Sequence, residues 1–242
     1  MARVWLACQQ QTVPSLGVPV LSDQGSLIAY DVRRSDRARR VRVRVERDAR
    51  VEVVLPRRAP AAAAERAVRE LRPWIERRLA HAARQQAAVA ARGDSLPYLG
   101  ISLRLHAEPG RAQVTRRGEE LLVPADASAR RALERWYRRM AREEISARLA
   151  RACAHSGLAY SRLAIRDQRT RWGSCSRAGA LSFNWRLLLA PEEVLDYVIW
   201  HEVCHLAVPD HSPRFWALVA DHCPDHRERA AWLRTNAATL VL

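Results

Sequence analysis

The sequence has no lysine, only two methionines and no cysteine pair in a C-x-x-C arrangement. Its five cysteines are scattered and odd in number, which argues against a disulfide framework and against a zinc ribbon built on cysteine. No apolar run is long enough for a membrane span. The apolar stretch near the amino terminus, V-W-L-A-C, is too short for a secretory signal. We therefore expect a cytoplasmic chain with no membrane partner.

Positive charge dominates the sequence but is unevenly distributed. The formal net charge is +15. Residues 33–92 hold 18 arginines against 7 acidic residues, a net of +11, and residues 127–151 add a net of +5. Residues 152–242 contribute only +1. The arginine-rich region 33–92 predicts contact with nucleic acid, although a solvated arginine-rich face would have the same composition.

The hydrophobic pattern divides the chain into three regions. Residues 1–26 have no clear period and form a lead-in that could be disordered. Residues 27–126 form a basic, β-rich region, in which alternation over 41–55 predicts a hairpin and an Ala/Arg-rich helix follows to about Arg92, interrupted near Pro73. Residues 127–242 alternate amphipathic helices with short strands and contain the candidate catalytic residues. The fold class is therefore α+β.

The residues that carry chemistry concentrate in one segment, Y-V-I-W-H-E-V-C-H-L. On a helix, His201 and His205 lie four residues apart, so both rings leave the same face. Two imidazoles at this spacing suit the bonds of about 2 Å and the tetrahedral angles of zinc. Glu202 points about 100° away and could take a proton from the water that zinc activates. The segment predicts one zinc ion per chain, with Glu202 as general base.

A catalytic zinc site needs a third protein ligand and an open fourth position. We prefer His211, which lies ten residues after His201 and is held between Pro209 and Pro213. This interval matches the metzincin pattern, but that pattern has glycine where this chain has Val208, and no methionine lies downstream. We expect the motif helix to end at Val208, before the proline. The competing ligands lie further along the chain: His222, Asp225, His226 and Glu228.

Four stretches of the sequence resemble the YgjP-like family of zinc metallopeptidases, relatives of the SprT-like and WLM proteases. They read Q-R-T-R-W-G-S-C-S, L-S-F-N-W-R-L-L-L-A-P, Y-V-I-W-H-E-V-C-H-L and D-H-S-P-R-F-W. The resemblance also reaches R-S-D-R-A-R-R-V-R-V-R-V, P-W-I-E-R-R-L and L-P-Y-L-G. It implies an α+β fold with a zincin-like catalytic domain after a small basic hairpin and helix region. It also implies His201, His205 and His211 as zinc ligands and Glu202 as base.

The stretch that precedes the motif helix offers candidates for substrate contact. Residues 181–186 could be a strand that pairs with an extended substrate. Arg171 and Trp172 could line the cleft, with Arg171 stabilising a developing oxyanion, and Asn184 is a further candidate. The alternative is that Trp172 and Trp185 belong to the core and that Gly173 and the serine after it form a turn.

Three functions fit the sequence. The leading hypothesis is a zinc metallopeptidase that cleaves proteins or peptides, which the basic region 33–92 could recruit to DNA-associated proteins. A nucleic-acid-binding protein with a structural zinc is the alternative, although such sites usually have four protein ligands. A metal-dependent hydrolase of a non-peptide amide is the third. The sequence leaves the oligomeric state open.

Overall fold

The computed structural model describes residues 27–46, 48–168 and 170–242, so the predicted lead-in lies outside the described residues. The chain divides into two compact units, residues 1–86 and 87–242. The fold class is α+β as predicted, because helices and three small sheets alternate along the described chain. Within the described residues, no helix is long and apolar enough to cross a membrane.

Unit 1 is built on a three-stranded sheet. Its elements are β1 (Tyr30–Ser35), β2 (Arg42–Val45), β3 (Val51–Pro56), α1 (Ala62–Glu70) and the first part of α2 (Arg72–Ala90). The strand order is β1-β3-β2, with β1 parallel and β2 antiparallel to β3, which confirms the predicted hairpin. Val53 and Leu55 are fully buried and share one core with Val68 and Ile75 of the helices. The predicted break near Pro73 falls at Leu71, so the proline lies in the first turn of α2, where it is tolerated.

A second sheet opens unit 2. It consists of β4 (Ser95–Tyr98), β5 (Ile101–Glu108), β6 (Thr115–Arg117) and β7 (Glu120–Pro124), in the order β4-β5-β7-β6. Leu103 and Leu121 of this sheet pack with Trp136 and Tyr137 of α3 (Ala129–Ser156). The sequence reading grouped these strands with the amino-terminal region 27–126. In the structure they belong with residues 127–242, because their apolar face is buried against α3.

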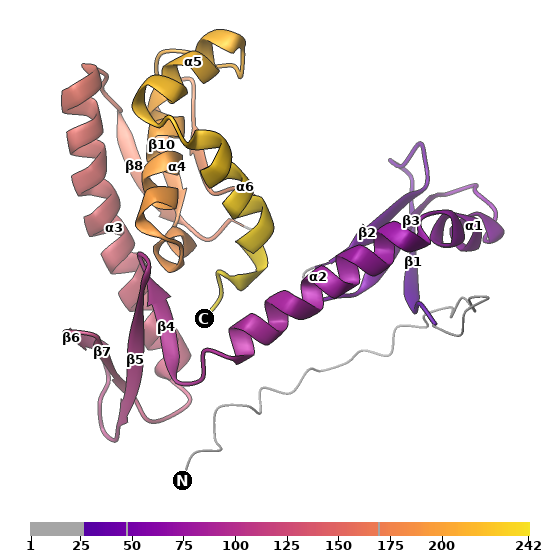
Figure 1. Ribbon diagram of the computed structural model, residues 1–242, viewed down its shortest axis with the longest axis horizontal. Helices are drawn as coiled ribbons and strands as arrows, with labels where there is room; N and C mark the ends of the chain where they lie inside the picture. Colours follow the sequence, from indigo (N-terminus) through magenta and orange to yellow (C-terminus); the bar gives the residue numbers. More distant parts are fainter. Residues whose placement is uncertain (1–26, 47, 169) are drawn as a thin grey trace. The chain divides into compact units, whose positions relative to one another are not determined.

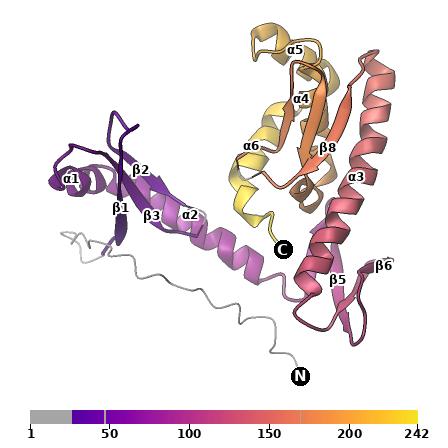
Figure 2. The same ribbon diagram turned by 180° about the vertical axis from the view of Figure 1, so that it is seen from behind.

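The remaining elements surround the motif helix. The motif helix is α4 (Glu192–Cys204), and the others are β8 (Arg162–Arg166), β9 (Gly173–Cys175), β10 (Ala180–Asn184), α5 (Pro213–His222), α6 (His226–Asn236) and the 3-10 helices η1 (Trp185–Leu189) and η2 (Ala237–Thr239). The strand order is β8-β10-β9. In both views α4 runs between α3 and α6 (Figures 1 and 2). Buried residues occur all around α4, so it is a core helix whose last turns can hold a desolvated site.

Candidate metal centre

The carboxyl-terminal end of α4 carries three of the predicted site residues. His201 and Glu202 lie in its last turn and His205 is the C-cap residue. The helix ends at Cys204 rather than at the predicted Val208. Beyond it the backbone tightens, as the N–H of Leu206 donates to the carbonyl of the residue three before it. The N–H of Val208 still donates to the Cys204 carbonyl at 2.9 Å, so the turn stays compact until the proline.

A short turn returns the chain to the motif helix and places His211 beside it. The N–H of Ser212 donates to the Asp210 carboxylate at 2.9 Å, which closes the turn just before Pro213 begins α5. The Nε2 atoms of His211 and His201 are 3.2 Å apart. One ligand nitrogen from each of His201, His205 and His211 lies within 4.8 Å of the others. The structure therefore brings the three predicted histidines together.

The protonation of these rings suits a metal ion. The Nδ1 atom of His205 is 3.0 Å from the Val208 carbonyl and must donate to it, which leaves a lone pair on Nε2. Burial, reinforced by the two neighbouring histidines, lowers the pKa of His201 to about 4. The rings of His201 and His205 are thus neutral near pH 7, with lone pairs turned toward a common point. Neutral imidazole nitrogens in a group of three fit zinc.

Phe215 forms the floor of the histidine cluster and was missed from the sequence. It comes from α5 and is fully buried. Its ring stacks on His205 with 4.3 Å between centroids and meets His201 and His211 edge-on at 4.9 Å each. The only signal in the sequence is its position four residues after His211. The contacts fix the orientation of all three imidazoles.

Glu202 is buried next to this cluster. Only 5% of the residue is exposed, and burial raises the pKa of Glu202 to about 8, with Arg171 acting in the opposite direction. Its Oε2 atom is buried and has no hydrogen-bond partner among the described residues. A buried carboxyl group with an unpartnered oxygen is expensive and points to a functional site.

Gly173 makes the position of Glu202 possible. A Cβ atom added at Gly173 would lie 2.5 Å from Oε1 of Glu202 and 2.7 Å from its Cγ. Gly173 is a residue of β9, so the turn that the sequence suggested here is wrong. Any side chain at this position would force the carboxyl group of Glu202 to move.

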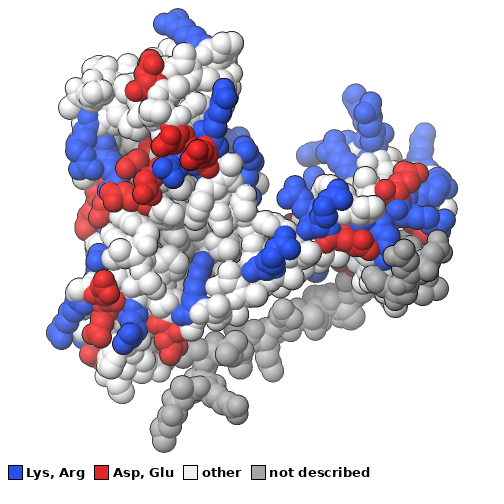
Figure 3. All heavy atoms as spheres, in the orientation of Figure 1, with Lys and Arg blue, Asp and Glu red and all other residues white. Residues whose placement is uncertain are grey.

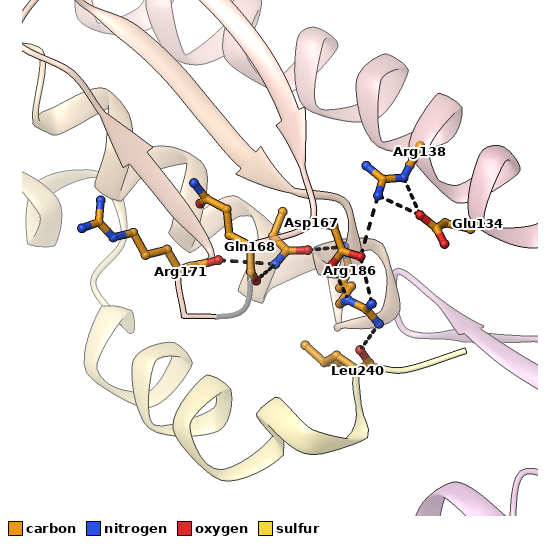
Figure 4. A network of polar contacts seen from close by, with 8 residues as sticks. Glu134, Arg138, Asp167, Gln168, Arg171, Arg186 and Leu240 are labelled. Atoms are coloured by element: carbon orange, nitrogen blue, oxygen red, sulfur yellow. Dashed lines mark hydrogen bonds and ion pairs between the residues drawn. The ribbon is translucent and has the colours of Figure 1, made fainter. Parts of the chain in front are cut away.

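The loop between β8 and β9 is held by a polar network (Figure 4). The side-chain amide of Asn184 donates to the Gln168 carbonyl at 2.7 Å, while its oxygen accepts from the N–H of Arg186 at 3.1 Å. The guanidinium of Arg186 pairs with Asp167 at 2.8 Å. Asn184 is only 2% exposed, so the prediction that it contacts substrate is corrected: it positions the loop that carries Arg171.

The other two candidates of this loop differ in exposure. Arg171 is exposed and close enough to Glu202 to affect its pKa, so it lies at the edge of the site. Trp172 is half-buried and packs against the main core, which agrees with the alternative reading of this residue. Of the three substrate candidates, Arg171 is the one that the structure leaves both exposed and near the site.

The strand that the sequence assigned to substrate pairing is a central strand. β10 pairs with β8 on one side and with β9 on the other, so residues 181–184 have no edge left for a peptide. That prediction is wrong, because strand order depends on contacts that periodicity does not reveal. β9 is the edge strand on the side of α4, and it carries Gly173 opposite Glu202.

The competing metal ligands do not join the cluster. His226 is buried, its Nδ1 atom donates to the Cys223 carbonyl at 3.2 Å, and its ring stacks on Trp216. His222 stacks on Trp200 with 4.0 Å between centroids. Glu228 is exposed in the first turn of α6. Among the residues that the structure describes, the candidate metal cluster contains only His201, His205 and His211.

Three convergent histidines with a buried glutamate directly after the first define the metal-dependent hydrolase site of an H-E-x-x-H protein. The family model described as "YgjP-like, metallopeptidase domain" matches residues 39–236. The chain belongs to this family and is a metal-dependent peptidase. It is also similar to the crystal structure of the metallopeptidase zymogen of Pyrococcus abyssi abylysin, with 22% identity and a TM-score of 0.32 over 36% of this chain and 90% of that one. No curated protein matches the sequence.

Proposed function

We propose that the protein is a zinc-dependent peptidase in which His201, His205 and His211 hold one zinc ion and Glu202 is the general base. One observation carries the proposal. The three imidazoles converge beside a buried carboxyl group that has an unpartnered oxygen. A desolvated acid next to a set of nitrogen ligands is the arrangement that metal-dependent hydrolysis requires.

The residues of the chain supply the proton transfers and the binding. His201, His205 and His211 would hold the zinc ion, which would supply a Lewis acid that polarises a carbonyl group and acidifies water. Glu202 accepts the proton of the attacking water and later delivers it to the leaving amine. Burial raises the pKa of Glu202 in the metal-free chain, and a cation bound beside it would lower this pKa again and favour the ionised form that a general base needs. Arg171, exposed at the edge of the site, is our candidate for binding the developing oxyanion.

The free edge of strand β9 is an argument for a peptide substrate. β9 pairs with β10 along one side only, within the described residues, and its Gly173 packs against Glu202. An extended peptide that adds to this edge would pass the base. A non-peptide amide could use the same chemistry but would gain nothing from the strand, so the strand favours peptides and proteins over this alternative.

The alternative of a structural zinc has less support. Structural zinc sites usually have four protein ligands. Cys204 directly precedes His205 in the sequence, but it is buried in the core and is not part of the cluster. Three ligands leave a fourth position for water and substrate, as a catalytic site needs.

The finer substrate class, DNA-associated proteins, requires that the chain also bind nucleic acid. The arginine-rich unit 1 supplies the charge for this second property. The expected cytoplasmic location remains a prediction from the sequence.

Metal analysis combined with a cleavage assay tests the proposal. The wild type should contain about one zinc per chain and cleave unfolded protein substrates. Glu202→Gln should keep the zinc and lose activity by at least about 100-fold, because it is not a ligand but removes the base. His201→Ala and His205→Ala should lose the zinc. Glu193→Gln, an exposed carboxylate of the same helix, is the matched control and should retain both. Loss of zinc in Glu202→Gln, or full activity, would contradict the assignment.

A further inference from the structure

The fold of unit 1 gathers arginines at one end of its sheet. Because β1 and β3 are parallel, the loop after β1 and the turn after β3 both start at the same end of the sheet. The antiparallel strand β2 begins near that end. Arg34 donates to the carbonyls of Arg57 and Ala59 at 2.7 and 2.8 Å, and Arg57 pairs with Asp36 at 3.0 Å. These bonds join the loop to the turn. We call the resulting cluster the arginine end: Arg34, Arg37, Arg39, Arg40, Arg42, Arg57 and Arg58.

Acidic residues are concentrated at the opposite end of the same sheet. Segments 33–45 and 54–61 contain nine arginines, including all seven of the arginine end, and a single acid, Asp36. Glu52 pairs in register with Asp31 and Arg44, away from that end. Glu46 and Asp48 lie in the turn between β2 and β3. The sequence shows only an excess of arginine, whereas the fold separates the charges into two ends.

Most side chains of the arginine end are available to a partner. Arg37, Arg39, Arg40, Arg42 and Arg58 are exposed, and no hydrogen bond or ion pair joins them to another described residue. By contrast, several arginines elsewhere in the unit are paired with carboxylates. Examples are Arg33 with Glu52, Arg50 with Asp48 and Arg69 with Glu65. Arginine covers much of the unit 1 surface in Figure 3.

The residue types in and around the arginine end indicate which class of partner it can bind. A guanidinium group can donate two parallel hydrogen bonds to a phosphate, so clustered arginines suit a polyphosphate backbone. No aromatic residue occurs between Tyr30 and Trp74. Single-stranded nucleic acid is usually held by bases stacked on aromatic rings, and surface-bound membrane proteins insert aromatic or large apolar side chains. This segment has no aromatic residue, and its exposed large apolar residues, Val32 and Leu71, are not part of the arginine end.

We propose that the arginine end binds the phosphate backbone of double-stranded nucleic acid without reading its sequence. The cluster contacts phosphates through Arg37, Arg39, Arg40, Arg42 and Arg58, whereas Arg34 and Arg57 hold the loop in place. This property does not depend on the metal centre. Together with the proposed peptidase activity, on which this last step rests, it would bring proteins bound to a duplex to the enzyme.

Two triple variants of the full-length protein test the proposal. One replaces Arg39, Arg40 and Arg58 by serine. The control replaces Arg44, Arg50 and Arg69 by serine. It removes the same amount of positive charge, but from arginines that lie beside carboxylates. Binding to a labelled DNA duplex is followed by fluorescence anisotropy over a range of salt concentrations. The first variant should bind at least about tenfold more weakly at low salt, with the salt slope reduced by about 2 to 3, while the control changes little.

Further probes separate the possible partners. A variant with lysine at positions 39, 40 and 58 keeps the charge and should retain most of the binding, which excludes misfolding as the cause of a loss. A single strand and phosphatidylserine vesicles should bind more weakly than the duplex. The proposal fails if both serine variants weaken binding equally, because net charge alone would then explain it. It also fails if the single strand or the vesicles bind as tightly as the duplex and respond to the same substitutions.

Discussion

The two ends of helix α4 both hold buried polar groups, but only one end provides partners for them. Near its amino terminus, Glu192 and Asp196 bind Arg148, which also pairs with Glu144 of α3. Arg148 is buried, yet each nitrogen of its guanidinium has a carboxylate partner. At the carboxyl end, Glu202 Oε2 and His201 Nδ1 are buried without a partner among the described residues.

This contrast indicates that the amino-terminal end of α4 stabilises the fold and that its carboxyl-terminal end serves function. A buried charge with full pairing costs little to keep and fixes α4 against α3. Buried polar atoms without partners destabilise the fold, and they persist where a ligand or a reaction uses them. One helix thus has an anchored end and a reactive end. Substitutions at the two ends should therefore differ in what they damage: stability at the first, zinc binding and catalysis at the second.

The largest effect should follow from removing His211, the proposed zinc ligand that lies in the turn after α4. His211→Ala should reduce activity below detection and weaken zinc binding by more than about 100-fold, the upper range for residues that only support a ligand. Glu228→Ala, which removes the main carboxylate competitor, should do neither, because Glu228 is exposed and outside the cluster. Zinc affinity is measured by competition with a chelator. If Glu228→Ala lost zinc and activity while His211→Ala kept both, the assignment of His211 as the third zinc ligand would be wrong.

Arg148→Met should break the anchored end. It removes the cation that three carboxylates share, and because these carboxylates are 33–57% exposed we expect a loss of about 2–3 kcal/mol. The free energy of unfolding is measured with denaturant, and Arg151→Met, an exposed neighbour on α3, is the control. The folded fraction should keep its zinc. A fall in zinc affinity as large as that of His211→Ala would mean that the two ends are not separable.

Gly173→Ala tests how closely the reactive end is packed. The new Cβ would displace the carboxyl group of Glu202, and a misplacement of about 1 Å at a reacting group can cost about 100-fold in rate. We expect kcat to fall by that amount while zinc content and stability stay near those of the wild type. Ser174→Ala is the control, since Ser174 bonds instead to Ser182, on the neighbouring strand. An unchanged kcat would show that Glu202 tolerates the displacement.

The sequence predicted the local part of the site and missed the part that depends on folding. Two histidines four residues apart on a helix must share a face, and a turn between two prolines leaves His211 few directions. Phe215, Gly173 and the loop anchor Asn184 reach the site through packing between separate elements, which spacing along the chain does not encode. The order of β8, β9 and β10 was missed for the same reason, since a strand's neighbours are set by distant residues.

The segregation of charge in unit 1 shows the same limit. Alternation of valine and arginine predicted the hairpin correctly. It did not predict that β1 lies parallel to β3, because that pairing joins segments far apart in the pattern. Only this pairing brings Arg34 to the same end of the sheet as Arg57.

The smallest expected effect is the loss of folding stability caused by burying Glu202 at the reactive end. It is measured as the free energy of unfolding of the metal-free protein at different pH values. In the folded chain the pKa of Glu202 is about 8, above the ordinary value of 4.5, because burial disfavours the ionised form. Between these two pH values the folded state holds more protons than the unfolded state, so stability should fall as pH rises from about 4.5 to about 8. The full shift corresponds to at most about 5 kcal/mol, and we expect roughly 2 kcal/mol once relaxation and water entry are allowed for.

Glu202→Gln isolates this contribution, because glutamine does not titrate. His201 acts in the opposite direction: its lowered pKa adds stability as pH rises from about 4 to about 6.5, but this occurs in both proteins. The difference in unfolding free energy between wild type and variant should therefore shift in favour of the variant as pH increases toward 8. Added zinc should reduce the difference, since a nearby cation favours the ionised carboxylate. Identical pH profiles for the two metal-free proteins would show that Glu202 is not desolvated, and the contrast between the two ends of α4 would then lose its physical basis.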